Sequence, residues 1–253
     1  FEPGQFYRLQ NFEMLAQGFL MEPLALTVAE CDQQSNLLTF IVREEHASQK
    51  LCAHLKPGEP VALMGPTGVR SKIPATPETV LVIGDTSSFA FIRSYGPALK
   101  SKGNHVIYIC QYPNDHDLYC REKLEQAVNQ CILHQSTRPD ALLQLVSELD
   151  KRILMAIDRI FVVGDVELLR HFQQAHKTLL SDLLPKNPKI YGSVYGSMQC
   201  MLKGVCAQCL QWQIDPNTGK RTKAVFACSW QNQPLELIDI DHLAWRDRQN
   251  RLL

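Results

Sequence analysis

The sequence predicts an α/β protein with an additional all-β part: a small antiparallel β-barrel, then a parallel-sheet α/β domain, then a cysteine-rich C-terminal segment. Short strand-like runs separated by turn residues fill the first part. Strand and helix patterns alternate in the middle, which is typical of a parallel sheet covered by helices. Four of the nine cysteines fall near the end. We place the three parts at residues 1–74, 75–195 and 196–253.

The first part consists of short runs rich in apolar and β-branched residues. These runs are QFYRLQ, LALTVAE and NLLTFIVREE, and LKPGEPVALMGPTG adds a Pro-Gly turn, an apolar run and a second Gly/Pro cluster. Their near-regular spacing favours a small antiparallel barrel. Because the chain opens at Phe1, without an initiator Met and inside a strand-like run, we expect it to be part of a longer protein.

The middle part alternates strands and helices after two prolines in SKIPATPETV mark the boundary. The expected strands are VLVIGD, HVIYICQ and IFVVGD, and the expected helices are SFAFIRSYGPALKSKG, DALLQLVSELDKRILMAID and VELLRHFQQAHKTLL. In the last part, two strand-like runs flank the turn sequence DPNTGK, which predicts a hairpin that brings Cys228 back towards Cys209. The chain closes with a helix-like HLAWRDRQNRLL.

Composition and charge exclude several classes of protein. Hydrophobic residues make up 45% and charged residues 21%, as in an ordinary soluble globular protein. Basic and acidic residues are equal at 26 each, so nothing favours a nucleic-acid partner or an anionic membrane. No apolar run approaches the ~20 residues of a membrane span, and no signal-peptide pattern is present. We therefore expect a cytoplasmic protein.

The cysteines fall into two sets. Five of them stand singly in apolar or helical contexts, which is the usage of a reducing compartment: Cys31, Cys52, Cys110, Cys120 and Cys131. The other four are grouped as Cys200, five residues, Cys206, two residues, Cys209, eighteen residues, Cys228.

The grouped cysteines have the spacing of a metal-binding segment. A structural zinc site usually pairs two C-x2-C knuckles, and only one is present here. The spacing is similar to the C-x4-C-x2-C…C arrangement around a plant-type [2Fe-2S] cluster, with one extra residue between Cys200 and Cys206. Gly204 would let backbone amides turn towards the sulfides. We predict a [2Fe-2S] cluster on Cys200, Cys206, Cys209 and Cys228, with zinc or four buried free thiols as the alternatives.

Motifs along the whole chain resemble one known family. PGQFYRL, LKPGEPVALMGPTG, VLVIGD and FACSWQNQPLELIDIDHLAWRDR are similar to the branch of the ferredoxin-NADP reductase superfamily that carries a C-terminal [2Fe-2S] segment. Its members include the electron-transfer subunit of dihydroorotate dehydrogenase and, with closer resemblance, the small subunit of NADH-dependent ferredoxin:NADP oxidoreductase. The resemblance implies that the barrel binds FAD, the α/β domain is of the NAD(P)-binding kind, and the cluster passes electrons to a partner.

The resemblance implies flavin contacts in the barrel. The P-G-Q-F opening corresponds to Pro3, Gly4, Gln5 and Phe6, and the G-P-x-G turn corresponds to Gly65, Pro66 and Gly68. EPLALT stands where the family has R-P-x-S or I-P-L-T-I, so Pro23, Leu24 and Thr27 remain while the phosphate-pairing Arg is absent. At the pyrophosphate loop the chain has HASQKL, where Ser48 could replace the family's Thr. Ordinary turn geometry is the alternative explanation for these Gly and Pro residues.

The family's dinucleotide motifs are largely missing. GDTSSFAF stands in place of the glycine-rich G-G-G-x-G-x-A-P turn, and of its landmarks only Gly84 and Ala90 remain. Side chains at glycine positions block close approach to a pyrophosphate, and Asp85 would repel it. The later G-P dipeptide is Gly164-Asp165 here, and we expect Asp165 to be the N-cap of the following helix. NAD(P) binding should therefore be weak or lost.

These observations predict an electron-transfer oxidoreductase module. It would relay electrons between a flavin or NAD(P)H and a partner, which is another oxidoreductase domain or subunit, through the [2Fe-2S] cluster. No catalytic acid, base or nucleophile is singled out by the sequence. The alternative is a reductase-fold subunit with a structural or regulatory role, which holds zinc or no metal and binds no nucleotide.

Overall fold

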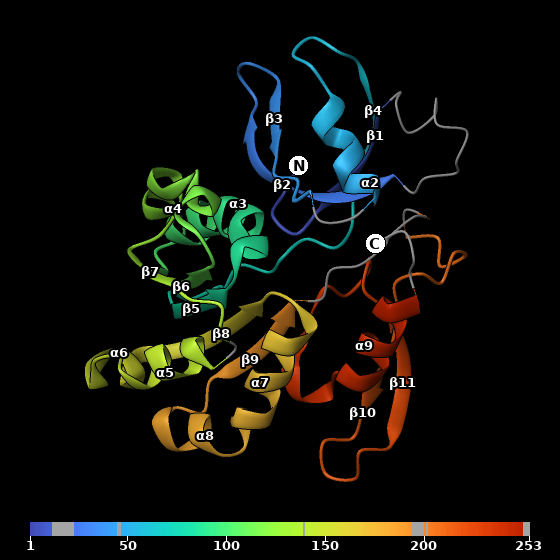
Figure 1. The fold of residues 1–253 in the computed structure, drawn as a ribbon. Helices are drawn as coiled ribbons and strands as arrows, with labels where there is room; N and C mark the ends of the chain where they lie inside the picture. The colour runs from blue at the N-terminus through green and yellow to red at the C-terminus, as the bar shows by residue number, and fades with distance from the viewer. Residues whose placement is uncertain (12–22, 45–46, 139, 194–199, 201, 250–253) are drawn as a thin grey trace.

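A computed structural model of the chain describes residues 1–11, 23–44, 47–138, 140–193, 200 and 202–249. Its first element group is a four-stranded antiparallel sheet in the order β3-β2-β1-β4. These strands are β1 (Phe6–Asn11), β2 (Leu24–Asp32), β3 (Leu37–Phe40) and β4 (Val61–Thr67), with α2 (Ala47–Lys50) and η1 (Leu51–His54) between the last two. This is the antiparallel part that the sequence predicts (Figure 1).

A six-stranded sheet forms the centre of the molecule, in the order β12-β9-β8-β5-β6-β7. Five of its strands are parallel: β5 (Thr79–Gly84), β6 (His105–Tyr112), β7 (Gln130–Gln135), β8 (Ile157–Val163) and β9 (Lys189–Ser193). The edge strand β12 (Asn232–Pro234) pairs antiparallel with β9. The predicted parallel-dominated α/β architecture is therefore confirmed.

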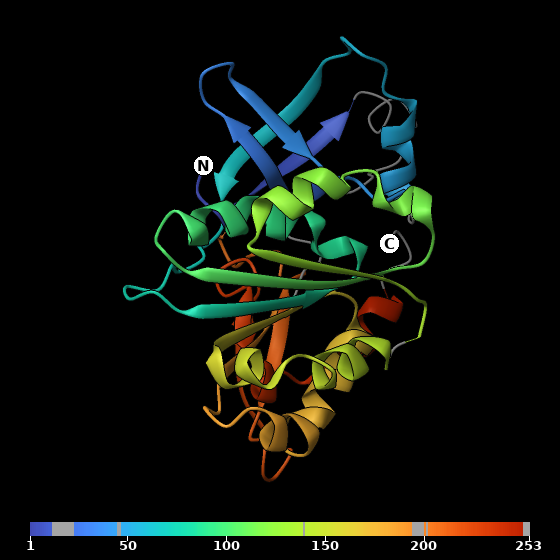
Figure 2. The ribbon, with the colours of Figure 1, turned by 90° about the vertical axis from the view of Figure 1, so that its left-hand side faces the viewer.

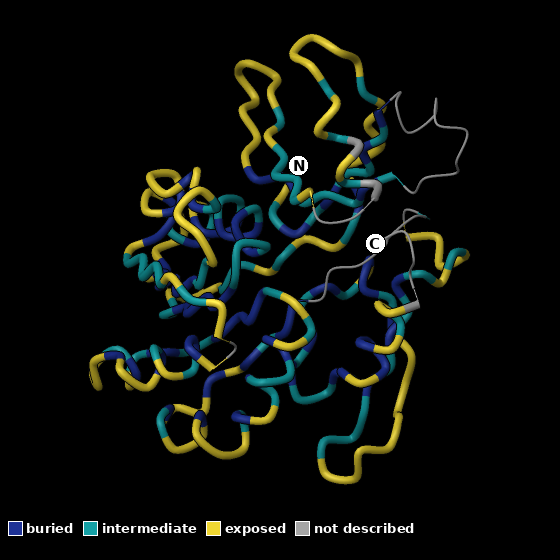
Figure 3. Tube along the Cα trace, in the orientation of Figure 1, coloured by how far each residue is buried: buried dark blue, intermediate teal, exposed yellow. Residues whose placement is uncertain are grey.

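Helices cover both faces of this sheet (Figure 2). One face packs on α3 (Phe89–Lys100) and α4 (Arg121–Ala127), while the other packs on α5 (Ala141–Ser147), α6 (Lys151–Ala156), α7 (Val166–His176) and α8 (Leu179–Leu183). Val80 and Val82 of β5 face the first layer, Leu81 and Ile83 face the second, and all four are 0% exposed. Burial on both faces explains why this strand reads as a continuous apolar run. Figure 3 shows the contrast with β3 and β4, which are largely exposed.

The helix expected over residues 140–158 is two helices and the start of a strand. A break separates α5 from α6, because the Asp150 side chain accepts a hydrogen bond from the Arg152 amide and caps a new helix. From Ile157 the chain enters β8. The periodicity of the two helices runs on across the cap, which is why the pattern resembles a single helix.

The C-terminal segment is built onto the six-stranded sheet. A hairpin of β10 (Leu210–Ile214) and β11 (Arg221–Phe226) turns at Asp215, whose carboxylate accepts hydrogen bonds from the Asn217 and Thr218 amides. The chain then supplies β12, η4 (Leu235–Leu237) and α9 (Ile240–Gln249). Strand β12 comes from the predicted third part of the chain but belongs to the central sheet. The boundary at residue 195 therefore stays a prediction. Within the described residues, no helix is long and apolar enough to cross a membrane.

A substitution at Gly96 tests the packing of α3 on its neighbour. A Cβ there would lie 2.5 Å from the Ala127 carbonyl oxygen. We expect Gly96→Ala to lower the free energy of unfolding by about 1–3 kcal/mol, because backbone must move. Helix propensity alone would raise the free energy of unfolding by about 1 kcal/mol, so the sign of the measured change tells which of the two effects is larger. Chemical denaturation measures the change, and a more stable variant would contradict the packing.

Candidate functional site

The predicted cluster cysteines meet the predicted flavin sheet in one small apolar core. Phe6 of β1, which is 1% exposed, belongs to the same buried cluster as Cys209, which is 4% exposed, and Cys228, which is 2% exposed. Ala227 completes the buried set, and Ala25 of β2 packs against it. Residues more than two hundred positions apart in the sequence therefore share one contact cluster.

Local structure fixes the members of this core. The amide of Ala227 donates to the Cys209 carbonyl at 2.9 Å, which closes the hairpin end and sets Cys228 beside Cys209. On the other side, Phe6 pairs with Thr27 across β1 and β2. Both partners of the contact are thus held by backbone hydrogen bonds rather than by side-chain packing alone.

The loop before the hairpin points backbone amides at a thiol. The amide and thiol of Cys206 and the amides of Val205 and Gly204 hydrogen-bond to Cys200 and lower its pKa to about 7, with the Cys206 amide contributing most. Leu202 and Ala207 adopt left-handed backbone angles, with φ of 71° and 52°. Left-handed residues in a loop allow successive N–H groups to face one centre. The loop thereby favours a thiolate at Cys200.

The four predicted ligands are close enough to influence one another. Burial, a hydrogen bond with Cys209 and the charges of Cys209, Cys200 and Cys206 together raise the pKa of Cys228 to about 12, with burial contributing most. Grouped thiols with amides turned towards one of them are the type of ligand that an iron-sulfur cluster uses. In the part of the chain that the structure describes, no three His, Cys, Asp or Glu side chains are arranged to hold a metal ion.

The predicted P-G-Q-F residues form the turn that leads into β1. Gly4 has a φ of 92°, and a Cβ there would lie 2.5 Å from the Ser71 amide nitrogen. That amide donates to the Pro3 carbonyl at 2.7 Å. The Gln5 side chain accepts from the Glu2 amide at 2.9 Å. These contacts explain the turn residues by packing, so their contact with flavin stays a prediction.

The predicted G-P-x-G residues lie at the end of β4. A Cβ at Gly65, where φ is 153°, would lie 2.7 Å from the Tyr7 ring. A Cβ at Gly68, where φ is 95°, would lie 2.8 Å from the Phe6 ring. Pro66 is exposed. Both glycines are needed for β4 to approach β1, and Gly68 also shapes the core around Phe6.

The remaining flavin candidates lie along β2 and α2. Pro23 precedes β2, Leu24 begins it and is buried, and Thr27 lies opposite Phe6. Ser48 belongs to α2, but its side chain lies outside the described part of the structure. The structure thus brings Thr27, Gly68 and Phe6 together beside Cys209.

Arg8 is a further candidate that the sequence motifs do not mark. It lies opposite Ala25 across β1 and β2, next to the EPLALT segment that lacks the family's Arg. Its guanidinium contacts the Met64 sulfur at 3.9 Å, and its Nε is buried without a hydrogen-bond partner among the described residues. Its position two residues after Phe6, on the same face of the strand, is the signal that could have found it.

The turn after β5 is closed by its own hydrogen bonds. The Asp85 carboxylate accepts from the Ser87 amide at 2.7 Å, from the Ser87 hydroxyl at 2.5 Å and from the Asp165 amide at 3.3 Å. The Ser88 hydroxyl lies 2.6 Å from the Tyr108 hydroxyl. A Cβ at Gly84 would lie 2.5 Å from a carbonyl oxygen of β8.

These residues do not fit a dinucleotide pyrophosphate. The Ser87 and Ser88 donors already bind protein groups, and the Asp85 carboxylate in the same turn would repel a phosphate. Arg43 approaches the Asp85 carboxylate at 3.9 Å from the first sheet, which ties this turn to β3 and its following loop. Asp165 accepts from the Leu168 amide at 2.7 Å, so its predicted role as the N-cap of α7 is confirmed.

No family model matches the chain. It is 30% identical over 252 residues to Uncharacterized protein RP006 of Rickettsia prowazekii (strain Madrid E), and it spans 28% of that protein's length. It is 24% identical over 219 residues, 85% of this chain and 79% of the relative, to the electron transfer subunit of dihydroorotate dehydrogenase B (NAD(+)) of Bacillus cereus (strain Q1).

A solved structure of an NADH-dependent reduced ferredoxin-NADP oxidoreductase, described in work on flavin-based electron bifurcation, superposes over nearly the whole chain. The TM-score is 0.78 at 21% identity, and the match covers 99% of this chain and 84% of the other. The chain has the ferredoxin-NADP reductase fold. In this fold the antiparallel sheet comes first and the parallel-dominated sheet second, as observed here.

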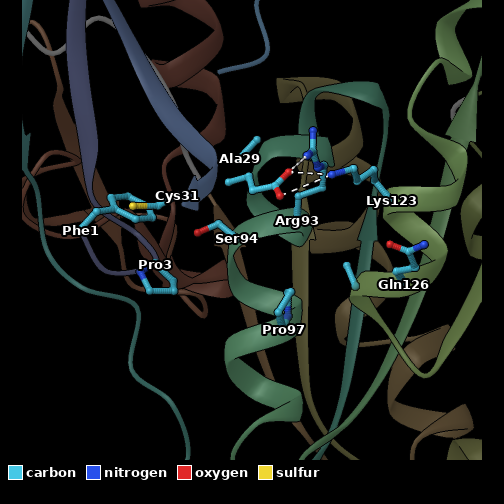
Figure 4. Close-up of a pocket in the computed structure, with 11 residues that line it drawn as sticks. Phe1, Pro3, Ala29, Cys31, Arg93, Ser94, Pro97, Lys123 and Gln126 are labelled. Carbon is cyan, nitrogen blue, oxygen red and sulfur yellow. Dashed lines mark hydrogen bonds and ion pairs between the residues drawn. The ribbon is translucent and has the colours of Figure 1, made fainter. Parts of the chain in front are cut away.

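A cavity of about 430 Å³ lies between β2 of the antiparallel sheet and the helices α3 and α4 (Figure 4). Arg93 of α3 and Lys123 of α4 bind Glu30 of β2 inside it. The Lys123 hydrogen bond, with the charges of both cations, lowers the pKa of Glu30. These two ion pairs of Glu30 join β2 to α3 and α4. Of the predicted flavin residues, Pro3 lines this cavity.

A pH titration tests the closed turn at Asp85. Burial raises the pKa of Asp85, and the Ser87 hydrogen bonds and the Arg43 charge only partly oppose this. A carboxyl with a raised folded-state pKa stabilises the fold at low pH, and this contribution disappears as the pH rises through that pKa. The melting temperature of the wild type minus that of Asp85→Asn should therefore increase as the pH falls from about 7 to about 5.

Asp140→Asn is the control for that titration. Asp140 is exposed and its pKa is lowered by Arg138, so its removal should not produce a difference that grows at lower pH. Differential scanning calorimetry on the three proteins gives the comparison. A wild-type advantage over Asp85→Asn that stays constant or shrinks as the pH falls would contradict the buried carboxyl.

Proposed function

We propose that this chain is an electron-transfer module of a flavin-dependent oxidoreductase. Cys200, Cys206, Cys209 and Cys228 would hold a [2Fe-2S] cluster, and the antiparallel sheet would hold FAD. The observation that carries the proposal is the buried core that Phe6 shares with Cys209 and Cys228. The same ring lies against Gly68 and opposite Thr27, two of the flavin candidates.

This core would hold the flavin site and the cysteines close enough together for electron transfer. When bound, the flavin and the cluster would supply the redox chemistry, and the chain supplies position and surroundings. Phe6 would separate the two sites by about one side chain and would exclude water from the cysteines behind it. Two features would set the environment of such a cluster: the burial of Cys209 and Cys228, and the amide donors around Cys200.

The loop of Cys200 and Cys206 offers a route to a partner. Val205 is 78% exposed and Leu202 is 41% exposed, so apolar side chains lie uncovered beside the two less buried cysteines. Another oxidoreductase domain or subunit docking on this loop would approach the cluster closely. The Bacillus relative, by its name an electron transfer subunit, supports a partner of this class.

NADH and NADPH would not react on this chain. The turn at Asp85 uses its donors internally and does not fit a pyrophosphate. Electrons would then enter through the flavin from a partner rather than from NADH or NADPH on this chain. The relatives named above act with NAD(H) or NADP according to their names, so this would be a departure from them.

The same turn favours a second candidate function, a reductase-fold scaffold without redox cofactors. It is supported by the turn after β5, where the Ser87 amide and the Ser88 hydroxyl bind protein groups. The scaffold would leave the amides around Cys200 without a role beyond the loop itself. Purified chain with zinc or no metal and no flavin would favour it.

Replacement of one cysteine at a time tests the cluster. We expect Cys209→Ser to contain less than about a tenth of the iron and sulfide of the wild type. The loss should be this large because a ligand is removed, and even a change next to a ligand can cost roughly tenfold. Cys31→Ser removes an exposed thiol of β2 that is remote in sequence from the group and should keep the wild-type content. Iron and sulfide per chain, measured after anaerobic purification, decide. Equal losses in both variants would contradict the ligand assignment.

Arg8 should supply a positive charge for the FAD phosphates in place of the missing Arg of the R-P-x-S motif. A hydrogen bond to a charged group contributes about 1.5–3 kcal/mol, so Arg8→Gln should raise the Kd for FAD about 10- to 100-fold. Arg70→Gln is the matched control, since Arg70 is exposed and paired with Glu2. Fluorescence titration of flavin-free chain measures both, and an unchanged Kd for Arg8→Gln would remove Arg8 from the site.

A further inference from the structure

One arginine of the C-terminal helix holds the C-x2-C knuckle. Nη2 of Arg246, on α9, donates to the carbonyl of Ala207 at 3.1 Å and to the carbonyl of Gln208 at 3.0 Å. These are the two residues between Cys206 and Cys209. A single side chain from α9 therefore fixes both peptide groups inside the knuckle.

The direction of those carbonyls determines the direction of the neighbouring amides. In a trans peptide the C=O and the next N–H point to opposite sides. With the Ala207 and Gln208 carbonyls turned to the guanidinium, the amides of Gln208 and Cys209 point away from it. The left-handed Ala207, with a φ of 52°, is held in an uncommon conformation at this place.

The guanidinium also brings a permanent positive charge to the knuckle. Arg remains protonated at all ordinary pH values. The helix α9 that carries it is anchored at its start, where Arg170 of α7 binds Asp241 at 2.5 Å and Arg221 of β11 binds Asp239 at 2.8 Å. The charge is therefore held at a fixed place next to two of the four cysteines.

We propose that Arg246 is a positioning residue for the cluster, which directs the knuckle amides and raises the reduction potential of the group on the cysteines. This rests on the proposed function. One-electron reduction adds one negative charge to the cluster, and a nearby fixed cation stabilises the reduced form. Amides aimed at the sulfurs would act in the same direction.

Three variants of the full chain separate charge from geometry. Arg246→Gln removes both, and Arg246→Lys keeps the charge but not the planar fork that reaches two carbonyls. Arg248→Gln is the matched control, because it removes the same charge from an exposed position on the same helix. Each protein is purified anaerobically, its iron and sulfide are quantified, and its midpoint potential is measured by an EPR-monitored titration with dithionite.

The expected result is a tenfold shift of the oxidised-to-reduced ratio towards the oxidised form in Arg246→Gln, which is about 59 mV for one electron. Arg246→Lys should keep most of the potential but lose iron faster in air than the wild type. Arg248→Gln should match the wild type in both. Hydrogen exchange should be faster over residues 207–210 in both Arg246 variants, whichever group the cysteines hold.

Two failures are distinguishable. If the wild type contains iron and sulfide, and Arg246→Gln matches Arg248→Gln in potential and in exchange, the inference is wrong while the proposed function stands. If the wild type contains neither iron nor sulfide, the proposed function is wrong and the tuning role of Arg246 is wrong with it.

Discussion

The contact between Phe6 and the cysteines of the C-terminal hairpin is the constraint on which the rest of the site depends. A ring from the first strand of the chain shares one buried cluster with Cys209 and Cys228 from its last fifty-four residues. To make this contact, β4 must approach β1 closely enough to need glycine at positions 65 and 68, and the hairpin must return Cys228 to Cys209. The two ends of the chain thus form one structural unit.

The central sheet supports this unit without carrying its chemistry. The hairpin is joined to the sheet by β12 and by buried glutamines, since Gln233 hydrogen-bonds to both Gln211 and Gln213. Asn232 of β12 also reaches the Ser71 hydroxyl at 3.2 Å, which links the sheet to the turn of Gly4. Meanwhile the turn after β5 has been converted into a hydrogen-bonded closure around Asp85. The reductase fold here joins the C-terminal hairpin firmly to the central sheet, and the turn after β5 is closed by its own hydrogen bonds.

Much of the fold could be predicted from the sequence, because its signals are local. Apolar runs such as VLVIGD are buried on both faces, and Asp165 caps the helix that follows it, as expected. The break at Asp150 could not be separated from helical periodicity, because the apolar spacing continues across the cap. The pairing of β12 with β9 joins distant segments by backbone hydrogen bonds, which leave no residue pattern in either strand.

The candidate site was predictable only in part for the same reason. Cysteine spacing singled out four thiols, of which the structure places Cys209 and Cys228 in one buried cluster, and the assignment of all four as ligands stays a prediction. Arg8, Arg246 and the role of Phe6 depend on cross-strand register and on helix docking, which no motif records.

The most direct test of the central claim, that the flavin sheet and the cysteines form one redox unit, is an anaerobic visible absorption spectrum of the purified chain. Iron, sulfide, zinc and extracted flavin should be quantified in the same sample. The account predicts iron and sulfide in equal amounts together with FAD. Zinc or no metal, without flavin, would contradict it and would leave the reductase fold as a scaffold.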